Sequence, residues 1–548
     1  IVAVTDEAGW NEENDKDFRS KLSFDYDMDW ITKGLSLEGY ASYDYSIGDD
    51  ELFHDLWTVY TYDQEDQEYI EHVGKHTEGQ TYSDLNKTSS TTREEFYNIR
   101  LHYERSFGDH NFTGFVAYEQ NEGYYEYLTG YRRDIISDQK VDLWAASTSG
   151  MESHGESSEW GRVNYFGSIG YDYQRKYLFD FTLRRDGSFN FPKEGRFGIF
   201  PSISVGWTIS DEPFMAATDS WLDNLKLRAS WAKMGNDRVP SFQYLTKYNL
   251  SSWYPFGEGS PVRFNGFQQA NVPNPNITWE SAKTWNVGFD AAMFDEMLIM
   301  NFSYFDEKRR DILISRAAAI PDYTGLSLPD ENLGKVDNRG VELELEHQNT
   351  VGANFKYNLG GNISYNHNEI VYMAEPKDVP KFREQEGHPM DSWVVYKTDG
   401  IFNTQEEIDN TEATLSGTKP GDIKYVDVNG DGEITGDDMV RRYTSQTPKI
   451  QFGFNTGLEY KGFKLSAFWQ GQAKAENFIA HIRGAHSNLP EYLFTKRWTE
   501  NNKDADYPRA YEREDYYNYR MSEFWLYNAS FIRLKNLTLS YNLPSEML

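Results

Sequence analysis

The chain has 548 residues, a formal net charge of -33 and no cysteine. The acidic balance argues against nucleic-acid binding, which needs clustered Lys and Arg, and the lack of cysteine excludes a disulfide scaffold, a thiolate zinc site and a cysteine nucleophile. No stretch reaches the roughly 20 apolar residues of a membrane-spanning helix, but β spans have a weaker sequence signal and are not excluded. Ile1–Trp10 lacks the basic start and apolar core of a signal peptide, so either such a peptide has been removed or the chain begins partway through a longer protein.

Apolar and polar residues alternate along several segments, and this period of two predicts β-strands. The alternation first runs through Leu22–Trp30 and recurs at Tyr177–Leu183, Val341–Leu345 and Phe463–Trp469. A helix would instead place apolar residues three and four positions apart. The aromatic fraction of 16% suits strands whose ends lie at a membrane–water boundary.

Short and long connections take turns between these strands. Short turns are expected directly after Trp30, Phe107, Tyr173, Phe294, Val351 and Tyr460. Long polar connections are expected at Ser46–Thr91, Tyr124–Ser158, Gly235–Ser281, Arg309–Asp337, Asn368–Thr447 and Ala473–Asn528. One connection, Asp211–Asp223, lies where a short turn is due and is expected to carry a short helix.

A soluble sandwich has no reason to place all its long loops at one end, whereas an outer-membrane barrel does. The sequence therefore predicts an all-β fold, a transmembrane antiparallel up-and-down β-barrel with short periplasmic turns and long extracellular loops. We expect about fifteen strands, an odd number where a bacterial barrel needs an even one. The chain is therefore expected to be part of a larger barrel, with an odd number of strands missing before it and an even number after it.

Several segments resemble the SusC/RagA family of TonB-dependent outer-membrane transporters, from bacteria of the Bacteroides group. They are RRDGSFNF…GRFGIFPSISVGWTISDEPFM (Arg184–Met215), LKLRASWAKMGND (Leu225–Asp237), Asn274–Phe294, Pro321–Leu345, DGIFNTQEEI (Asp399–Ile408), GDIKYVDVNGDGEI (Gly421–Ile434) and FIRLKNLTLSYNLP (Phe531–Pro544). They occur in order from about Arg184 to the end, and together they are specific.

The resemblance implies a barrel of about 22 strands in the bacterial outer membrane, surrounded by lipid, with an N-terminal plug and a TonB box. It implies import of oligosaccharides, driven by TonB, together with a SusD-like surface lipoprotein; a RagA-like importer would take oligopeptides instead. The chain departs from the family in showing no plug-like region, no TonB box and no final strands. Residues 1–548 are therefore expected to be barrel and extracellular loops only.

The segment DVNGDGEITGDD predicts a calcium site in an extracellular loop. Calcium takes six to eight oxygen ligands, and alternating acidic residues on a tight loop supply them. The candidate ligands, in loop order, are Asp427, Asn429, Asp431, Glu433, Thr435 and Asp438. An EF-hand loop ends on Glu, so the closing Asp resembles a dockerin-type loop. The alternative is a turn rich in Asp, Asn and Gly that holds no ion.

Aromatic residues in or beside the long loops are candidates for substrate contact. Flat rings with a polar tip stack on sugar rings and also suit protein partners. The candidates are Trp253, Tyr254, Tyr323, Trp393 and Tyr396. The alternative for each is packing within a loop or a place in the interfacial aromatic girdle.

The sequence gives little support to an enzyme. The eleven His residues form no HExxH pair, and no GxSxG turn presents a nucleophilic serine. Two further classes compete with a transporter: a passive porin or adhesin-like barrel, and a soluble carbohydrate-binding protein built of several sheets.

Overall fold

The computed structural model describes residues 6–76, 80–137, 140–257, 262–315, 328–376, 379–480, 490–510 and 517–543. The chain forms two compact units, of which the first holds Ile1–Tyr171, Thr182–Phe189 and Arg196–Ile199, and the second holds the rest, including Phe200–Leu548. In the part of the chain described, no helix combines the length and the apolar character needed to cross a membrane.

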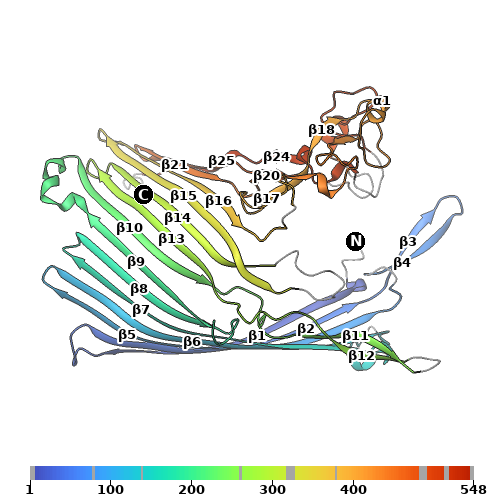
Figure 1. The fold of residues 1–548 in the computed structure, drawn as a ribbon, viewed down its shortest axis with the longest axis horizontal. Coiled ribbons are helices and arrows are strands. Elements are labelled where there is room, and N and C mark those ends of the chain that lie inside the picture. Colours follow the sequence, from blue (N-terminus) through green and yellow to red (C-terminus); the bar gives the residue numbers. More distant parts are fainter. Residues whose placement is uncertain are drawn as a thin grey trace. The chain divides into compact units, whose positions relative to one another are not determined.

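Antiparallel strands dominate the fold (Figure 1), and 15 of them form one sheet. In sheet order they are β1 (Gly9–Asp27), β2 (Leu35–His54), β5 (Asp84–Phe107), β6 (His110–Arg133), β7 (Glu152–Tyr173), β8 (Tyr177–Ser188), β9 (Phe197–Thr208), β10 (Leu222–Asn236), β13 (Glu280–Met293), β14 (Leu298–Ser315), β15 (Asp330–Val351), β16 (Phe355–Tyr372), β21 (Ile450–Tyr460), β22 (Phe463–Ala473) and β25 (Phe531–Tyr541). Sheet order follows chain order, which confirms the predicted all-β, antiparallel, up-and-down arrangement.

Shorter elements lie in the connections between these strands, apart from one 3-10 turn that precedes β1. The strands are β3 (Trp57–Asp63), β4 (Glu68–Gly74), β11 (Tyr248–Phe256), β12 (Val262–Gln269), β17 (Ser392–Tyr396), β18 (Thr398–Ile401), β19 (Ile423–Tyr425), β20 (Met439–Ser445), β23 (Glu476–Phe478) and β24 (Leu526–Asn528). The helices are α1 (Gln405–Asp409), α2 (Glu491–Thr495) and the 3-10 turns η2 (Asp6–Ala8), η3 (Leu143–Ala145), η4 (Ile209–Asp211), η5 (Pro213–Thr218), η7 (Gly436–Asp438), η9 (Tyr517–Tyr519) and η10 (Glu523–Trp525).

The predicted alternation of connections is confirmed. The turn from β21 to β22, for example, is Lys461-Gly462, and both residues have positive φ, 46° and 87°. That is the backbone of a tight hairpin whose twist matches the strands. The longer β9–β10 connection carries η4 and η5 at the place where the sequence predicts a short helix.

The strands run further than the alternation predicts. The ladder between β1 and β2 begins at Gly9 opposite His54, and β5 begins at Asp84, inside segments predicted as loop. Backbone hydrogen bonds continue here although apolar and polar residues no longer alternate. A strand with polar residues on both faces has lost the signal on which a sequence prediction depends.

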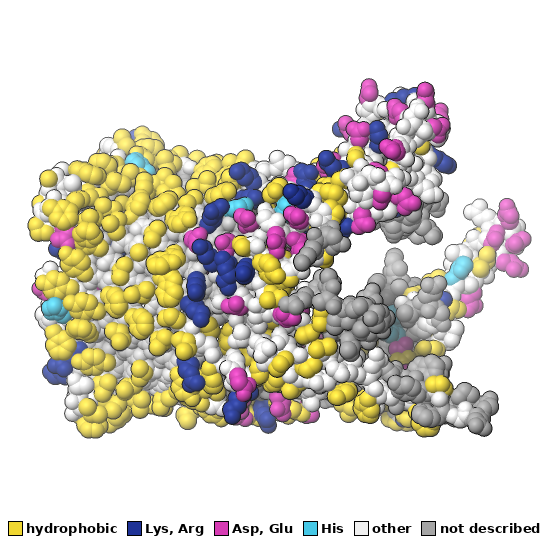
Figure 2. Space-filling view, viewed as in Figure 1, with side chains coloured by type: hydrophobic (Ala, Val, Ile, Leu, Met, Phe, Trp, Pro, Cys, Tyr) yellow, Lys and Arg dark blue, Asp and Glu magenta, His cyan; other side chains and the backbone are white. Residues whose placement is uncertain are grey.

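The two faces of the sheet differ sharply in the second unit. One row of directly opposed residues crosses five strands as Val287, Tyr304, Val341, Tyr365 and Ile450. The first four are 37–44% exposed. Figure 2 shows a wide hydrophobic field on the surface of the molecule. A contiguous apolar surface of this extent marks an interface with a membrane or another apolar partner.

The next row along the same strands is polar. It runs through Gly288, Ser303, Glu342, Ser364 and Gln451, again directly opposed across β13, β14, β15, β16 and β21. Successive side chains of a strand point to opposite faces, so a register slip of one residue would exchange these rows. The separation of an apolar face from a polar face therefore specifies the pairing of these five strands.

Candidate functional site

The largest folded structure outside the sheet is built from two connections together. We call it the loop module, with described residues 388–447, 475–480, 490–510 and 517–528, which come from the β16–β21 and β22–β25 connections. Its buried core joins Ile423 and Tyr425 of the first connection to Tyr517 and Trp525 of the second. A backbone hydrogen bond of 3.0 Å from the Tyr396 N–H to the Met521 carbonyl also joins the two connections. The two connections therefore fold as one body.

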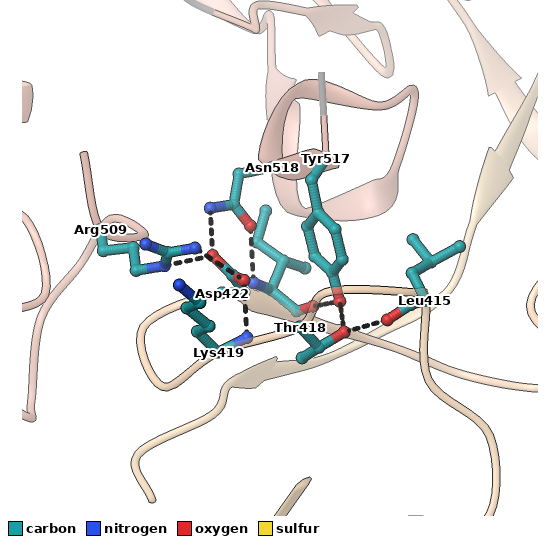
Figure 3. A network of polar contacts seen from close by, with 8 residues as sticks. Leu415, Thr418, Lys419, Asp422, Arg509, Tyr517 and Asn518 are labelled. Carbon is teal, nitrogen blue, oxygen red and sulfur yellow. Dashed lines mark hydrogen bonds and ion pairs between the residues drawn. The ribbon is translucent and has the colours of Figure 1, made fainter. Parts of the chain in front are cut away.

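A buried carboxylate ties the two connections together (Figure 3). The Asp422 side chain is 0% exposed, and one of its oxygens accepts hydrogen bonds from Arg509 Nε at 2.7 Å and Asn518 Nδ2 at 3.0 Å. Its other oxygen accepts from Arg509 Nη2 at 3.2 Å and the Lys419 backbone N–H at 2.9 Å. Asn518 in turn accepts from the Ile423 backbone N–H at 2.8 Å. A buried charge with this many donors is stably held and is too enclosed to bind cargo.

Sequence reasoning did not find this network. Arg509 and Asn518 lie 87 and 96 positions from Asp422 in the chain. With 87 acidic residues present, nothing local distinguishes Asp422 from its neighbours. The one signal is Gly421, whose φ is +92° and where a Cβ would lie 2.4 Å from the Trp498 ring. Only glycine fits that position.

The predicted calcium loop folds around its own carboxylates. Asp427 accepts from the backbone N–H groups of Gly430 at 2.7 Å and Gly432 at 2.8 Å, and these bonds, that of Gly432 foremost, hold the pKa of its carboxyl below the usual value. Asn429 Oδ1 accepts from the Asp431 N–H, and Asp431 Oδ1 accepts from the Glu433 N–H, both at 2.9 Å. Side chains predicted as calcium ligands therefore hold the loop's backbone in place through hydrogen bonds to its N–H groups.

The last two candidate ligands have structural tasks as well. Thr435 caps η7 through its hydroxyl, which accepts from the Asp437 N–H, and the fully buried Asp438 accepts from the N–H groups of Val428 and Thr435. The Asp438 side chain also helps to lower the pKa of Asp427. Each carboxylate offers about four lone-pair sites, so these bonds leave lone pairs that an ion could use.

Among the described residues, no group of three or more His, Asp or Glu side chains is arranged to hold a metal. The calcium site draws on Asn429, Thr435 and a backbone carbonyl besides acidic groups, and it stays a prediction.

The aromatic candidates have different surroundings. Tyr396 is 8% exposed and its ring lies 5.4 Å from that of Tyr425 in the core of the loop module, so its visible role is packing. Trp393 is half-buried and donates from Nε1 to the Glu476 carbonyl at 2.9 Å. Trp253 and Tyr254 lie in β11, but their side chains are outside the described residues, as is the whole of Tyr323. Contact with a substrate stays a prediction for all of them.

The polar face of the second unit forms the other candidate site. Arg228 on β10 lies 3.1 Å from Asp290 on β13 and donates to Ser303 Oγ on β14 at 2.6 Å. Asn301 donates to Glu344 on β15 at 3.3 Å. These residues line a hollow of about 680 Å³. Its amides, hydroxyls and carboxylates present both donors and acceptors, which suits reversible hydrogen bonding to a polar cargo.

Comparison with known proteins assigns the family. The TonB dependent receptor-like, beta-barrel family model matches residues 3–547. TonB-dependent receptor P3 of Formosa agariphila is 30% identical over 489 residues, covering 86% of this chain and 47% of that protein. TonB-dependent receptor SusC of Bacteroides thetaiotaomicron is 27% identical over 470 residues, covering 81% of this chain and 44% of SusC. The chain spans about half the length of the curated relatives it matches.

The fold is also that of solved transporters. The structure of the RagAB peptide transporter matches with a TM-score of 0.74 over 98% of this chain and 57% of that one, at 20% identity. The family match explains why the apolar row of the sheet is exposed: in a membrane barrel, such residues face lipid. The chain belongs to the TonB-dependent receptor-like β-barrel family, a family of transporters and receptors, and is an outer-membrane protein.

Proposed function

We propose that this chain is the barrel wall of a transporter that imports oligosaccharides across the outer membrane, driven by TonB and assisted by a SusD-like surface lipoprotein. In this proposal the chain is a conduit and performs no catalysis. The similarity in sequence to SusC, over 81% of this chain, supports it. The runner-up is a RagA-like oligopeptide importer, supported by the likeness in fold to the RagAB peptide transporter.

The observation that carries the proposal is the polar face of the sheet. Ser303, Glu342, Ser364 and Gln451 are directly opposed across adjacent strands, on the side away from the apolar row. In a barrel that side lines the lumen. Hydroxyl, amide and carboxylate groups exchange hydrogen bonds readily with sugar hydroxyls, because each sugar hydroxyl both donates and accepts.

Uptake by the full-length transporter tests the proposal. Cells carrying it would be offered labelled neutral oligosaccharides and, separately, labelled oligopeptides, with and without TonB. We expect oligosaccharide uptake that disappears without TonB. Uptake of peptides alone would favour the runner-up, and uptake that persists without TonB would favour a passive porin.

The loop module supports the lipoprotein partner. It offers a folded surface with exposed rings, including Tyr443 at 64% and Phe494 at 51%. Removing residues 388–447 and 476–528 together, each replaced by a short linker, is expected to weaken co-purification of the lipoprotein encoded beside the transporter. Unchanged co-purification would contradict a role for the module.

We also propose that calcium binds the loop of Asp427, Asn429, Asp431, Glu433, Thr435 and Asp438. The ion would be structural, joining a backbone turn that its ligands already hold together. Extracellular modules of this kind bind calcium at about 10⁻⁴–10⁻³ M.

A further inference from the structure

Three lysines lie directly opposite one another on adjacent strands of the second unit. Lys233 on β10 is the register partner of Lys283 on β13, and Lys283 is the partner of Lys308 on β14. We call these three the lysine row. Cross-strand partners have Cβ atoms about 4.5–5.5 Å apart, and like charges in this position repel.

The lysine row is on the lipid side of the wall. Side chains on one face recur every second residue, and Lys283 is followed on its face by Trp285 and Val287, which are 57% and 44% exposed. Lys308 shares its face with Tyr304 of the apolar row. The tight turn between β13 and β14 is at the opposite end of both strands. The lysine row therefore borders the apolar field at the end of the strands that carries the long loops.

Aromatic side chains lie beside the lysine row, at nearly the same height along the strands. The rings of Trp231 and Trp285, one step closer to the apolar field, lie 6.3 Å apart. Rings of this kind gather at the membrane–water boundary, at the level of the lipid headgroups. The lysine row is thus placed at headgroup depth, where a long apolar stem lies along the wall and the ammonium reaches the polar layer.

More basic groups extend the lysine row along the edge of the apolar field. Figure 2 shows Lys and Arg side chains gathered along this edge. Near the lysine row along the strands lie Arg310, Arg339 (the register partner of His367), Lys335 at 5.4 Å from the Tyr372 ring and Lys474 at 5.6 Å from the Tyr365 ring. We call the lysine row and these four residues the basic belt. It lies on a chain whose net charge is -33.

The protein does not neutralise the lysine row itself. Within the residues that the structure describes, none of the three lysines forms an ion pair. Asp337, the register partner of Lys308, lies 2.6 Å from Arg310 instead. Asp306, two residues from Lys308 on the same face of β14, is the register partner of Arg339. Three adjacent lysines whose neighbouring carboxylates lie opposite or beside arginines form an arrangement that an external anion stabilises.

We propose that the basic belt binds the phosphate-bearing headgroups of lipids in the outer leaflet around the barrel. Phosphate oxygens accept charge-assisted hydrogen bonds from Lys and Arg, and basic residues beside a membrane bind anionic lipid. Because the basic belt lies at the depth of the lipid headgroups, we expect its phosphate ligand to belong to a lipid and not to be a soluble phosphate. This inference is independent of the cargo, because the belt is on the opposite face from the lumen.

The test compares two triple variants of the full-length transporter in phosphatidylcholine nanodiscs. One removes the lysine row, Lys233→Gln, Lys283→Gln and Lys308→Gln. The control makes the same charge change at exposed lysines of the tight-turn end, Lys33→Gln, Lys356→Gln and Lys461→Gln. Bisphosphorylated lipid A, or its dephosphorylated form, is titrated in, and bound lipid is counted by native mass spectrometry. Heat-modifiable migration on gels verifies that each variant is folded.

We expect the wild type and the control variant to bind bisphosphorylated lipid A tightly and the dephosphorylated form weakly. Each lysine near an anionic surface contributes about a fivefold gain in binding, so the lysine-row variant should bind about a hundredfold more weakly. Equal binding by the two variants would overturn the proposal. Equal binding of the two lipid forms to the wild type would overturn it too, because acyl chains and not phosphates would then be recognised.

Discussion

Replacing Asp422 by Ala should open the loop module without unfolding the sheet. The substitution removes the acceptor of two Arg509 hydrogen bonds, one from Asn518 and one from the Lys419 backbone. Breaking one side of a buried ion pair costs about 3–5 kcal/mol. Because the Arg509 side chain is 20% exposed, water partly solvates its guanidinium after the carboxylate is removed, and we expect the lower end of this range.

The loop module supplies its own control. Asp399 pairs with Lys424 at 2.8 Å, almost the distance of Asp422 to Arg509, but the Asp399 side chain is 68% exposed. An ion pair so exposed contributes about 0–1 kcal/mol. Asp399→Ala and Asp422→Ala thus remove the same group from the same module and differ in burial.

Limited trypsin digestion of the full-length protein measures the difference, because the Lys424–Tyr425 peptide bond becomes cleavable when the module opens. When opening and closing are fast, the cleavage rate follows the population of the open form. We expect cleavage of Asp422→Ala to be about a hundredfold faster than wild type, since 1.4 kcal/mol is tenfold, and that of Asp399→Ala to change less than about fivefold. Equal cleavage of the two variants would refute the argument that burial sets the strength of this network.

The remaining predictions concern the same module. Asp427→Ala combined with Asp431→Ala should abolish calcium-dependent protease resistance of that loop, as read by digestion with and without EGTA; anomalous scattering that shows no calcium at the wild-type loop would defeat the site. The pKa of Asp427 is lower in the folded loop than its usual value of 3.8. Its carboxylate therefore stabilises the loop fully above pH 3.8, and this stabilisation is lost as the pH falls through the pKa of the folded loop. Exchange of the Gly432 amide, corrected for the intrinsic effect of pH, should accelerate only below that point. Gly421→Ala should destabilise the module far more than Gly400→Ala, which also has positive φ but has no atom within 4 Å of its Cβ position; similar melting of both would contradict the steric argument.

The sequence predicts the sheet well, because each strand reveals its two faces within a few residues. The alternation at Val341–Leu345 is enough to place Glu342 and Val341 on opposite faces, as the register shows. The strand ends were missed where β2 and β5 extend beyond the alternating residues, because the backbone ladder has no sequence signal of its own.

The loop module could not be predicted in the same way. Its core depends on Ile423 meeting Tyr517 and Trp525, which lie in a different connection. The same packing explains why Tyr396, chosen from the sequence for substrate contact, has a buried ring. Local residue types indicate a turn or an aromatic side chain, but they do not show which distant segment will cover it.

The shared core of the loop module also limits how its surface can change in evolution or by design. A graft that moves only the β16–β21 connection into a related transporter would leave Ile423 and Tyr425 without Tyr517 and Trp525, and Asp422 without Arg509. The β16–β21 and β22–β25 connections must therefore be exchanged together if the partner-binding surface of the loop module is to stay folded. Exchanges that keep each pair intact should give working chimeras, and exchanges that split a pair should not.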